Sequence, residues 1–97
     1  MPAALGHIAH LRELLHELEN EAGLLDLSEV ERLILYAMNR IAAASEDGTV
    51  RTDEMRAHVL LTSVTQPTFY RALRTLRDKR YVDIAPNART KTYVLTR

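Results

Sequence analysis

The side chains best suited to chemistry gather in one stretch, VTQPTFYRALRTLRDKRYV at residues 64–82. A helix is predicted over about 65–79, with Pro67 in its first turn, where a missing amide hydrogen is harmless. At helical spacing one face is apolar and is expected in the core: Phe69, Ala72, Leu73 and Leu76. The other faces present Thr65, Gln66, Thr68, Tyr70, Arg71, Arg74 and Arg77.

These outward residue types are the ones that contact duplex DNA. A helix fits the major groove, where arginine donates two hydrogen bonds to guanine and glutamine pairs with adenine. Threonine and tyrosine hydroxyls, with the free amides at a helix start, hold phosphates. Arg89 and Lys91 fall on a turn between two predicted strands and could contact the flanking backbone or the minor groove. The alternative is an exposed basic helix without a partner.

The formal charge of zero hides two oppositely charged halves. Residues 1–48 carry three arginines against nine acidic side chains, a net charge of −6. Residues 49–97 carry ten basic side chains against four acidic ones, a net charge of +6. Eight of those ten basic residues follow position 65. This division indicates that only the second half meets a polyanion.

The N-terminal segment has the spacing of a helix seam. A helix is predicted over about residues 3–23, with Gly23 as its C-cap. The seam recurs at alternating intervals of three and four and consists of Ile8, Leu11, Leu15, Leu18 and Ala22. It could pack on its own domain or pair with a second copy. We favour dimerisation, because the remaining residues make a complete small domain. Residues 1–25 are therefore assigned to a dimerisation helix and 26–97 to a second domain.

The second domain begins with a helix marked by a capping box, in which Ser28 and Glu31 cap each other's backbone amides. This helix is expected to be the central core helix. Its predicted buried face comprises Val30, Leu33, Ile34, Ala37 and Ile41, broadened by Leu35, Met38 and Ala42.

A loop is predicted at residues 45–49, followed by a short extended piece around Val50 and Arg51. Thr52 is expected to start a short helix over about 52–59. After the basic helix, YVDIAP and KTYVLTR read as two strands joined by the turn NART. The fold class is mainly α with a small β-hairpin.

Enzyme function is not indicated. The chain has no cysteine, no phosphate-binding glycine loop and no His-Glu-x-x-His helix, and no cofactor is expected. His7, His10 and Glu13 have a spacing that could hold a metal ion, but such residues are more often solvated, so no metal site is assigned. No apolar run is long enough to span a bilayer, and the start lacks the pattern of a signal peptide. A cytoplasmic location is expected.

Residues 28–96 resemble a winged helix-turn-helix domain of bacterial transcriptional regulators, with the MarR type the nearest subgroup. The resemblance is strongest over SVTQPTFYRALRTL, residues 63–76, which in that superfamily marks the turn and the recognition helix. It implies a cytoplasmic DNA-binding regulator. The implied DNA contacts are Gln66, Thr68, Tyr70, Arg71 and Arg74, with Arg89 and Lys91 as wing contacts; we add Thr65 from its place at the helix start.

The chain departs from the MarR pattern in two ways. No helix follows the second predicted strand, so the N-terminal helix is expected to form a two-fold dimer that reads half-sites about one turn of DNA apart. Many winged domains have glycine where the recognition helix ends, and this chain has Arg80. A left-handed conformation there would cost roughly 1 kcal/mol, so a different helix exit is expected. No effector ligand can be assigned.

The rival interpretation is a winged helix that binds protein without binding DNA. Such a surface would be expected to carry apolar anchors, and Tyr70 is the only outward ring between residues 66 and 77. DNA binding should weaken steeply with added salt, whereas protein docking should depend on salt less.

Overall fold

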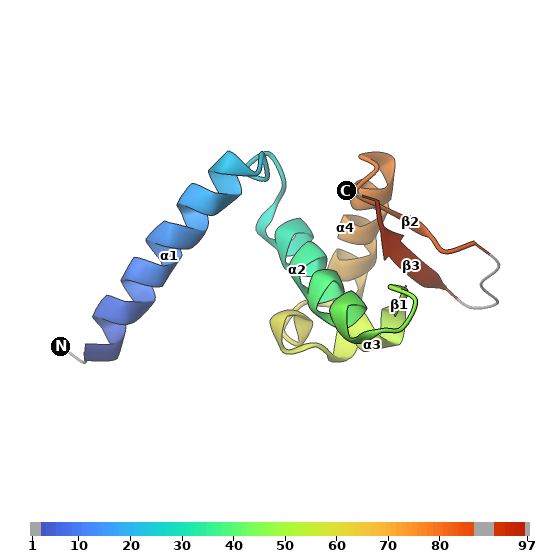
Figure 1. Cartoon of the computed structure of the whole chain (residues 1–97), viewed down its shortest axis with the longest axis horizontal. Coiled ribbons are helices and arrows are strands. Elements are labelled where there is room, and N and C mark those ends of the chain that lie inside the picture. The colour runs from blue at the N-terminus through green and yellow to red at the C-terminus, as the bar shows by residue number, and fades with distance from the viewer. Residues whose placement is uncertain (1–2, 87–90, 97) are drawn as a thin grey trace.

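The computed structural model describes residues 3–86 and 91–96, and it is mainly helical with a small antiparallel sheet. Figure 1 shows the order of the elements along the chain. They are α1 (Ala3–Glu21), α2 (Glu29–Ala44), β1 (Val50–Arg51), α3 (Thr52–Ala57), the 3-10 turn η1 (Val59–Leu61), α4 (Gln66–Asp78), β2 (Val82–Ile84) and β3 (Thr92–Leu95).

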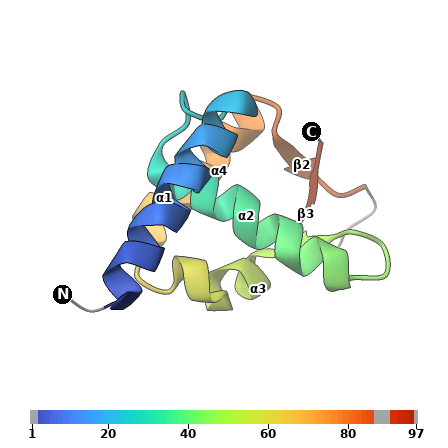
Figure 2. The ribbon, with the colours of Figure 1, turned by 60° about the vertical axis from the view of Figure 1, so that its left-hand side comes forward.

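Helix α1 extends away from the other elements in Figure 1, and the molecule measures 51 Å along its long axis against 28 and 25 Å. Figure 2 shows the same molecule with α1 turned toward the viewer, in front of α4. The predicted C-cap is confirmed, because Gly23 has a φ of 74°. The amide of Leu24 donates to the carbonyl of Glu19 at 2.8 Å, which closes the helix end. The helix itself ends at Glu21, two residues before the predicted limit.

Polar contacts connect α1 to α2. Glu19 is the buried residue of α1; its carboxylate accepts a 2.5 Å hydrogen bond from the Tyr36 hydroxyl and lies 3.4 Å from the Arg32 guanidinium. Burial, followed by the hydrogen bond to Glu19 and its negative charge, raises the pKa of Tyr36 to about 12. Arg12 adds a longer ion pair to Glu29, at 3.9 Å. The side of α1 that faces its own domain is therefore polar.

Helix α2 begins with the predicted capping box. The Glu31 amide donates to the Ser28 hydroxyl at 3.2 Å, and the Ser28 amide donates to the Glu31 carboxylate at 3.0 Å. The predicted face packs on the core, with Val30, Leu33 and Ile41 half-buried against it. The fully packed residues are Ile34, Leu35, Ala37 and Met38, because α2 contacts α3 and η1 as well as α4 and the sheet.

One hydrophobic core joins α2, α3, η1, α4 and the sheet. Its largest fully buried side chains come from every one of these elements: Ile34, Met38, Val50, Met55, Leu61, Phe69, Leu76 and Val82. The described side chains of α1 are absent from that core, so α1 lies outside the packed domain.

The helix predicted over 52–59 is shorter than expected and is followed by η1. His58 has an extended conformation, with φ −70° and ψ 142°, which ends α3 at Ala57. The helix starts at Thr52, as predicted; its N-cap is Arg51, whose amide donates to the Glu54 carboxylate at 3.0 Å. Helix α4 agrees with its predicted bounds, with Thr65 and Lys79 as its two caps.

The two strands predicted near the C-terminus are confirmed as the antiparallel pair β2 and β3, with Ile84 opposite Tyr93. The sequence did not reveal that the short strand β1 joins them: it pairs with β3, with Val50 opposite Tyr93, so the sheet order is β1-β3-β2. The connecting turn at 87–90, which includes Arg89, lies outside the described residues.

The expectation of a different helix exit at Arg80 was wrong. Arg80 has a φ of 64°, the left-handed conformation that glycine adopts most easily. The amide of Tyr81 donates to the carbonyl oxygen of Leu76 at 2.9 Å. The amide of Arg80 donates to the carbonyl oxygen of Arg77, also at 2.9 Å. The Thr96 hydroxyl also donates to the Arg80 carbonyl. These hydrogen bonds hold the turn despite the steric penalty.

Candidate nucleic-acid interface

The inner face of α4 determines which of its side chains point outward. Phe69, Leu73 and Leu76 are buried, as predicted, and α4 packs on α2 and β2. The Tyr70 ring meets Phe69 edge to face, with the ring centroids 5.0 Å apart. A helix anchored by its full apolar face has a fixed position on the domain, which determines the side of the molecule from which its outer side chains project.

Arg56 of α3 holds the turn that leads into α4. Its Nη1 donates to the carbonyl oxygen of Val64 at 2.7 Å, and its guanidinium lies 5.1 Å from the centroid of the Phe69 ring. This arginine is therefore engaged inside the protein. Sequence reasoning missed this role, because the contact joins residues eight positions apart through the folded chain.

The outer face of α4 carries the two arginines that the sequence singled out. Arg71 and Arg74 are both exposed. Within residues 3–86 and 91–96, neither guanidinium forms an ion pair with an acidic side chain. An arginine without an internal partner keeps all its donors available for a ligand.

A groove of about 540 Å³ is lined by residues of both α4 and the β2–β3 hairpin. The Lys91 ammonium lies 6.0 Å from the centroid of the Tyr70 ring, so a hairpin cation comes next to the helix. Four of the predicted contact residues line this groove together, namely Gln66, Tyr70, Arg74 and Lys91. The fold thus gathers residues from two separate segments on one surface.

The remaining predicted residues lie at the start of α4 or outside this groove. Thr65 is the N-cap, but its hydroxyl donates to the Thr68 hydroxyl at 2.9 Å and makes no hydrogen bond to the helix backbone. The amides of Gln66 and Thr68 have no acceptor within the helix, because first-turn amides lack one. Arg71 does not line the groove, and Arg89 lies outside the described residues.

Arg77 was not among the assigned contact residues, although it lines the same groove. The signal was present in the sequence, because Arg77 follows Arg74 by three positions and Tyr70 by seven, which places all three on one side of a helix. Its guanidinium is 3.9 Å from the Asp83 carboxylate, with both side chains substantially exposed. Such an exposed ion pair is weak, so Arg77 can exchange Asp83 for another anion.

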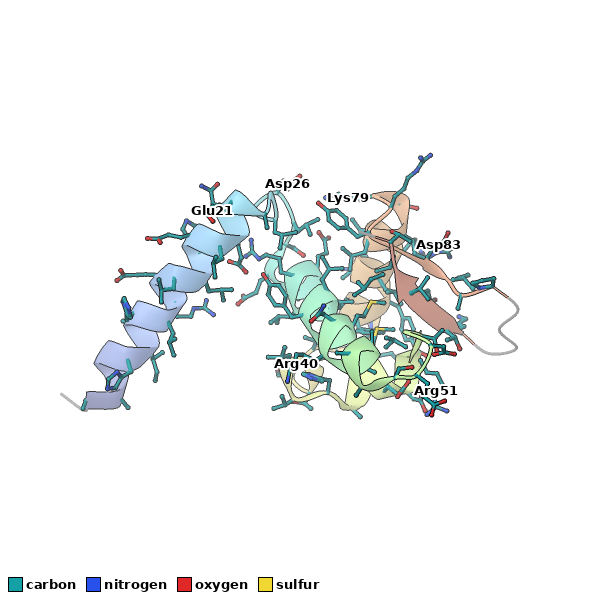
Figure 3. The ribbon with its side chains drawn as sticks, in the orientation of Figure 1. Glu21, Asp26, Arg40, Arg51, Lys79 and Asp83 are labelled. Carbon is teal, nitrogen blue, oxygen red and sulfur yellow. The ribbon has the colours of Figure 1, made fainter. Side chains whose placement is uncertain are left out.

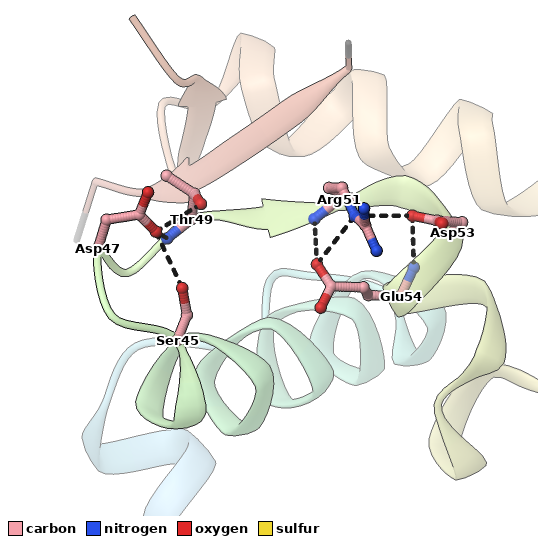
Figure 4. A network of polar contacts seen from close by, with 6 residues as sticks. All are labelled: Ser45, Asp47, Thr49, Arg51, Asp53 and Glu54. Carbon is pink, nitrogen blue, oxygen red and sulfur yellow. Dashed lines mark hydrogen bonds and ion pairs between the residues drawn. The ribbon is translucent and has the colours of Figure 1, made fainter.

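Acidic side chains limit the cationic surface at β1 and α3. Figure 4 shows Arg51 between two carboxylates, with Asp53 at 3.4 Å and Glu54 at 3.6 Å. In the preceding loop, hydrogen bonds from Thr49 and then Ser45 lower the pKa of Asp47 to about 2. The charge of Arg51 is balanced locally, so it adds little to a surface for polyanions.

No group of three or more histidine, aspartate or glutamate side chains is placed to hold a metal ion in the described part of the chain. Over the same residues, every helix is too short or too polar to cross a lipid bilayer. Comparison with family models, with curated proteins and with solved structures finds no match to this chain.

Proposed function

We propose that this chain is a sequence-specific double-stranded DNA-binding protein with a winged helix-turn-helix arrangement. In this proposal α4 is the recognition helix, the β2–β3 hairpin is the wing, and the protein regulates transcription in the bacterial cytoplasm. The succession of α3, η1 and α4 followed by a hairpin supports the arrangement. The observation that carries the proposal is the pair of exposed arginines on the outer face of α4, Arg71 and Arg74, which lack ion pairs with any described acidic side chain.

The dimensions of α4 agree with insertion into the major groove. An α-helix with its side chains is about 10–12 Å across, which fits the major groove of about 12 Å, and the 13 residues of α4 span about 20 Å along their axis. Arg71 and Arg74 are the candidates for guanine contacts, and Gln66 is the candidate for adenine. The Thr65 and Thr68 hydroxyls and the first-turn amides are placed to hold a phosphate at the helix start.

The hairpin supplies the second contact. Lys91, beside Tyr70, lies where it can neutralise a phosphate that flanks the α4 site. Arg77 can exchange Asp83 for a phosphate on the same side. Together these residues form a surface on which the helix reads bases and the hairpin fixes its position on the backbone.

The alternative of a protein-docking winged helix has less support. Exposed apolar side chains do occur, with Val59 79% and Leu60 37% exposed, but both lie on η1 and not on α4. Ile84, which lines the groove, is also an exposed apolar side chain, but it lies on β2. A docking surface centred on α4 would need apolar anchors that its outer face does not carry.

Selection from a random duplex library tests the proposal, because it needs no known operator. We expect the protein to enrich a defined sequence and to bind it with an affinity that falls steeply as salt rises. Arg40→Ala is the matched control, because Arg40 is exposed on α2 and lies at the opposite end of the domain from the hairpin residue Asp83 (Figure 3). Failure to enrich any duplex would contradict the proposal.

A further inference from the structure

The apolar seam of α1 is uncovered in the folded chain. Ile8 is 56% exposed, Leu11 is 63% exposed and Leu18 is 61% exposed, and only Leu15 of the seam is half-buried. The face that α1 turns to its own domain is built from Arg12 and Glu19, with Leu15 as the one seam residue that also lies there. Of the two alternatives for the seam, packing on its own domain is therefore not what this fold uses.

The seam defines a heptad register and two flanks. Ile8, Leu15 and Ala22 take the first core position, and Leu11 and Leu18 take the second. We call the flank that contacts α2 the inner flank; it consists of Leu5, Arg12 and Glu19. The outer flank, on the other side of the seam, consists of His7, Leu14 and Glu21. All three of its residues are exposed.

The outer flank is self-complementary in an antiparallel pair. A two-fold axis between antiparallel helices brings each flank against the same flank of the second copy. With the axis beside Leu14, that leucine meets its own copy, and His7 meets Glu21 of the second copy at both ends. The imidazole can donate a hydrogen bond to the carboxylate whether it is neutral or protonated. Glu21 is the last residue of α1, and its side chain is exposed (Figure 3).

The same register makes each layer of the seam apolar. In this register Ile8 would pack on Leu18 of the second copy, and Leu11 would pack on Leu15. The outermost layers pair Ala4 with Ala22, so small side chains close both ends. On the inner flank the Arg12 side chains of the two copies would come near each other. Each guanidinium lies 3.9 Å from the Glu29 carboxylate of its own chain, which offsets the repulsion between them.

A groove beside the seam fits this arrangement. It has a volume of about 180 Å³ and lies between α1, α2 and η1, with Leu15, Leu33 and Leu60 among its lining residues. In the antiparallel register Leu5 of the second copy comes beside Glu19, at this groove. This accounts for the apolar Leu5, 46% exposed, on a flank that is otherwise charged.

A parallel pair has no such complementarity. There, each outer-flank residue meets the inner-flank residue five positions later in the second copy. His7 would meet Arg12, a hydrogen-bond donor that offers no acceptor to the imidazole N–H, and Leu14 would meet Glu19. Glu19 is already held by Tyr36 and Arg32. Parallel helices would also align their macrodipoles unfavourably.

We propose that α1 pairs with α1 of a second copy in antiparallel orientation, with Leu14 on the two-fold axis and His7 against Glu21. This dimer forms without DNA, so it stands or falls independently of the proposed DNA binding. It goes beyond the dimer expected from the seam, because it fixes the orientation and the register.

Single-cysteine variants of the full chain test the orientation, because the native sequence has no cysteine. We expect a mixture of His7→Cys and Glu21→Cys to form a mixed disulfide on mild oxidation, and Leu14→Cys to cross-link with itself. Arg40→Cys places an exposed cysteine on α2 and measures the background of disulfides formed by random collision. Self-cross-linking of Leu18→Cys without the mixed disulfide would indicate a parallel pair and overturn the proposal. Cross-linking no greater than for Arg40→Cys would overturn it as well.

Charge reversal gives an independent test by sedimentation equilibrium. Glu21→Lys should weaken the dimer by about 2- to 30-fold, since two exposed charge contacts are lost per dimer. The double variant His7→Glu with Glu21→Lys should restore the affinity. Circular dichroism checks that the fold is intact, which is expected because both side chains are exposed. Equal affinity for the single variant and the native chain, or no recovery in the double variant, would contradict the register.

Discussion

Replacing Arg80 with glycine should stabilise the protein. The residue has a φ of 64°, where a side chain at Cβ costs about 1–2 kcal/mol. Glycine removes that penalty but adds about 0.5–1 kcal/mol of chain entropy to the unfolded state. The hydrogen bonds that hold the turn come from backbone groups and from the Thr96 hydroxyl, so the substitution keeps them. Subtracting the midpoints of these two ranges, about 1.5 and about 0.75 kcal/mol, gives an expected net gain in the free energy of unfolding of about 0.75 kcal/mol.

Urea denaturation of Arg80→Gly measures this gain directly, and the midpoint of thermal unfolding should rise by about 2–8 °C for a domain of this size. Gly48→Ala is the matched control. Gly48 has a φ of 74° and no atom near enough to obstruct an added Cβ, so the variant should lose stability through the same backbone effect. An Arg80→Gly variant no more stable than the native chain would refute the idea that the helix exit is strained.

Three further predictions concern separate contacts. The pKa of Tyr36 is raised to about 12, so the stability that its neutral form contributes should be complete below about pH 10 and lost between about pH 10 and 12. Urea denaturation at several pH values measures this loss, and Tyr36→Phe should abolish it. Arg56→Ala removes a charged donor from the Val64 carbonyl and should lower the free energy of unfolding by about 1.5–3 kcal/mol in urea denaturation. Lys91→Ala should reduce the salt dependence of DNA affinity by about one unit of slope in anisotropy titrations, because one phosphate contact is lost.

Features with a local cause were predictable from the sequence. The capping box needs only Ser28 and Glu31 three positions apart, and the end of α1 needs only the conformational freedom of Gly23. The inner face of α4 follows from helical spacing, which correctly placed Phe69 in the core.

Features that join distant segments were not predictable. The pairing of β1 with β3 connects Val50 to Tyr93, and no pattern in either segment identifies its partner. The contact of Glu19 with Tyr36 connects α1 to α2 across 17 positions, and no local pattern identifies either residue as the partner of the other. Arg80 shows that surrounding hydrogen bonds can impose a conformation that the residue type disfavours.

The placement of the candidate site combines both kinds of information. Helical spacing alone placed Arg71 and Arg74 on the outside of α4. Only the folded chain brings Lys91 next to Tyr70 and includes Arg77 in the same groove.

The most direct measurement of the central claim is the affinity of Arg71→Ala and Arg74→Ala for a duplex selected by the native protein. At fixed salt, each variant that loses a base contact should bind about 1–3 kcal/mol more weakly in fluorescence anisotropy, while Arg40→Ala should bind as the native chain does. A loss of affinity that is large for the selected duplex and small for unrelated DNA would show that α4 contacts the bases. Unchanged affinity for both variants would contradict the assignment of α4 as the recognition helix.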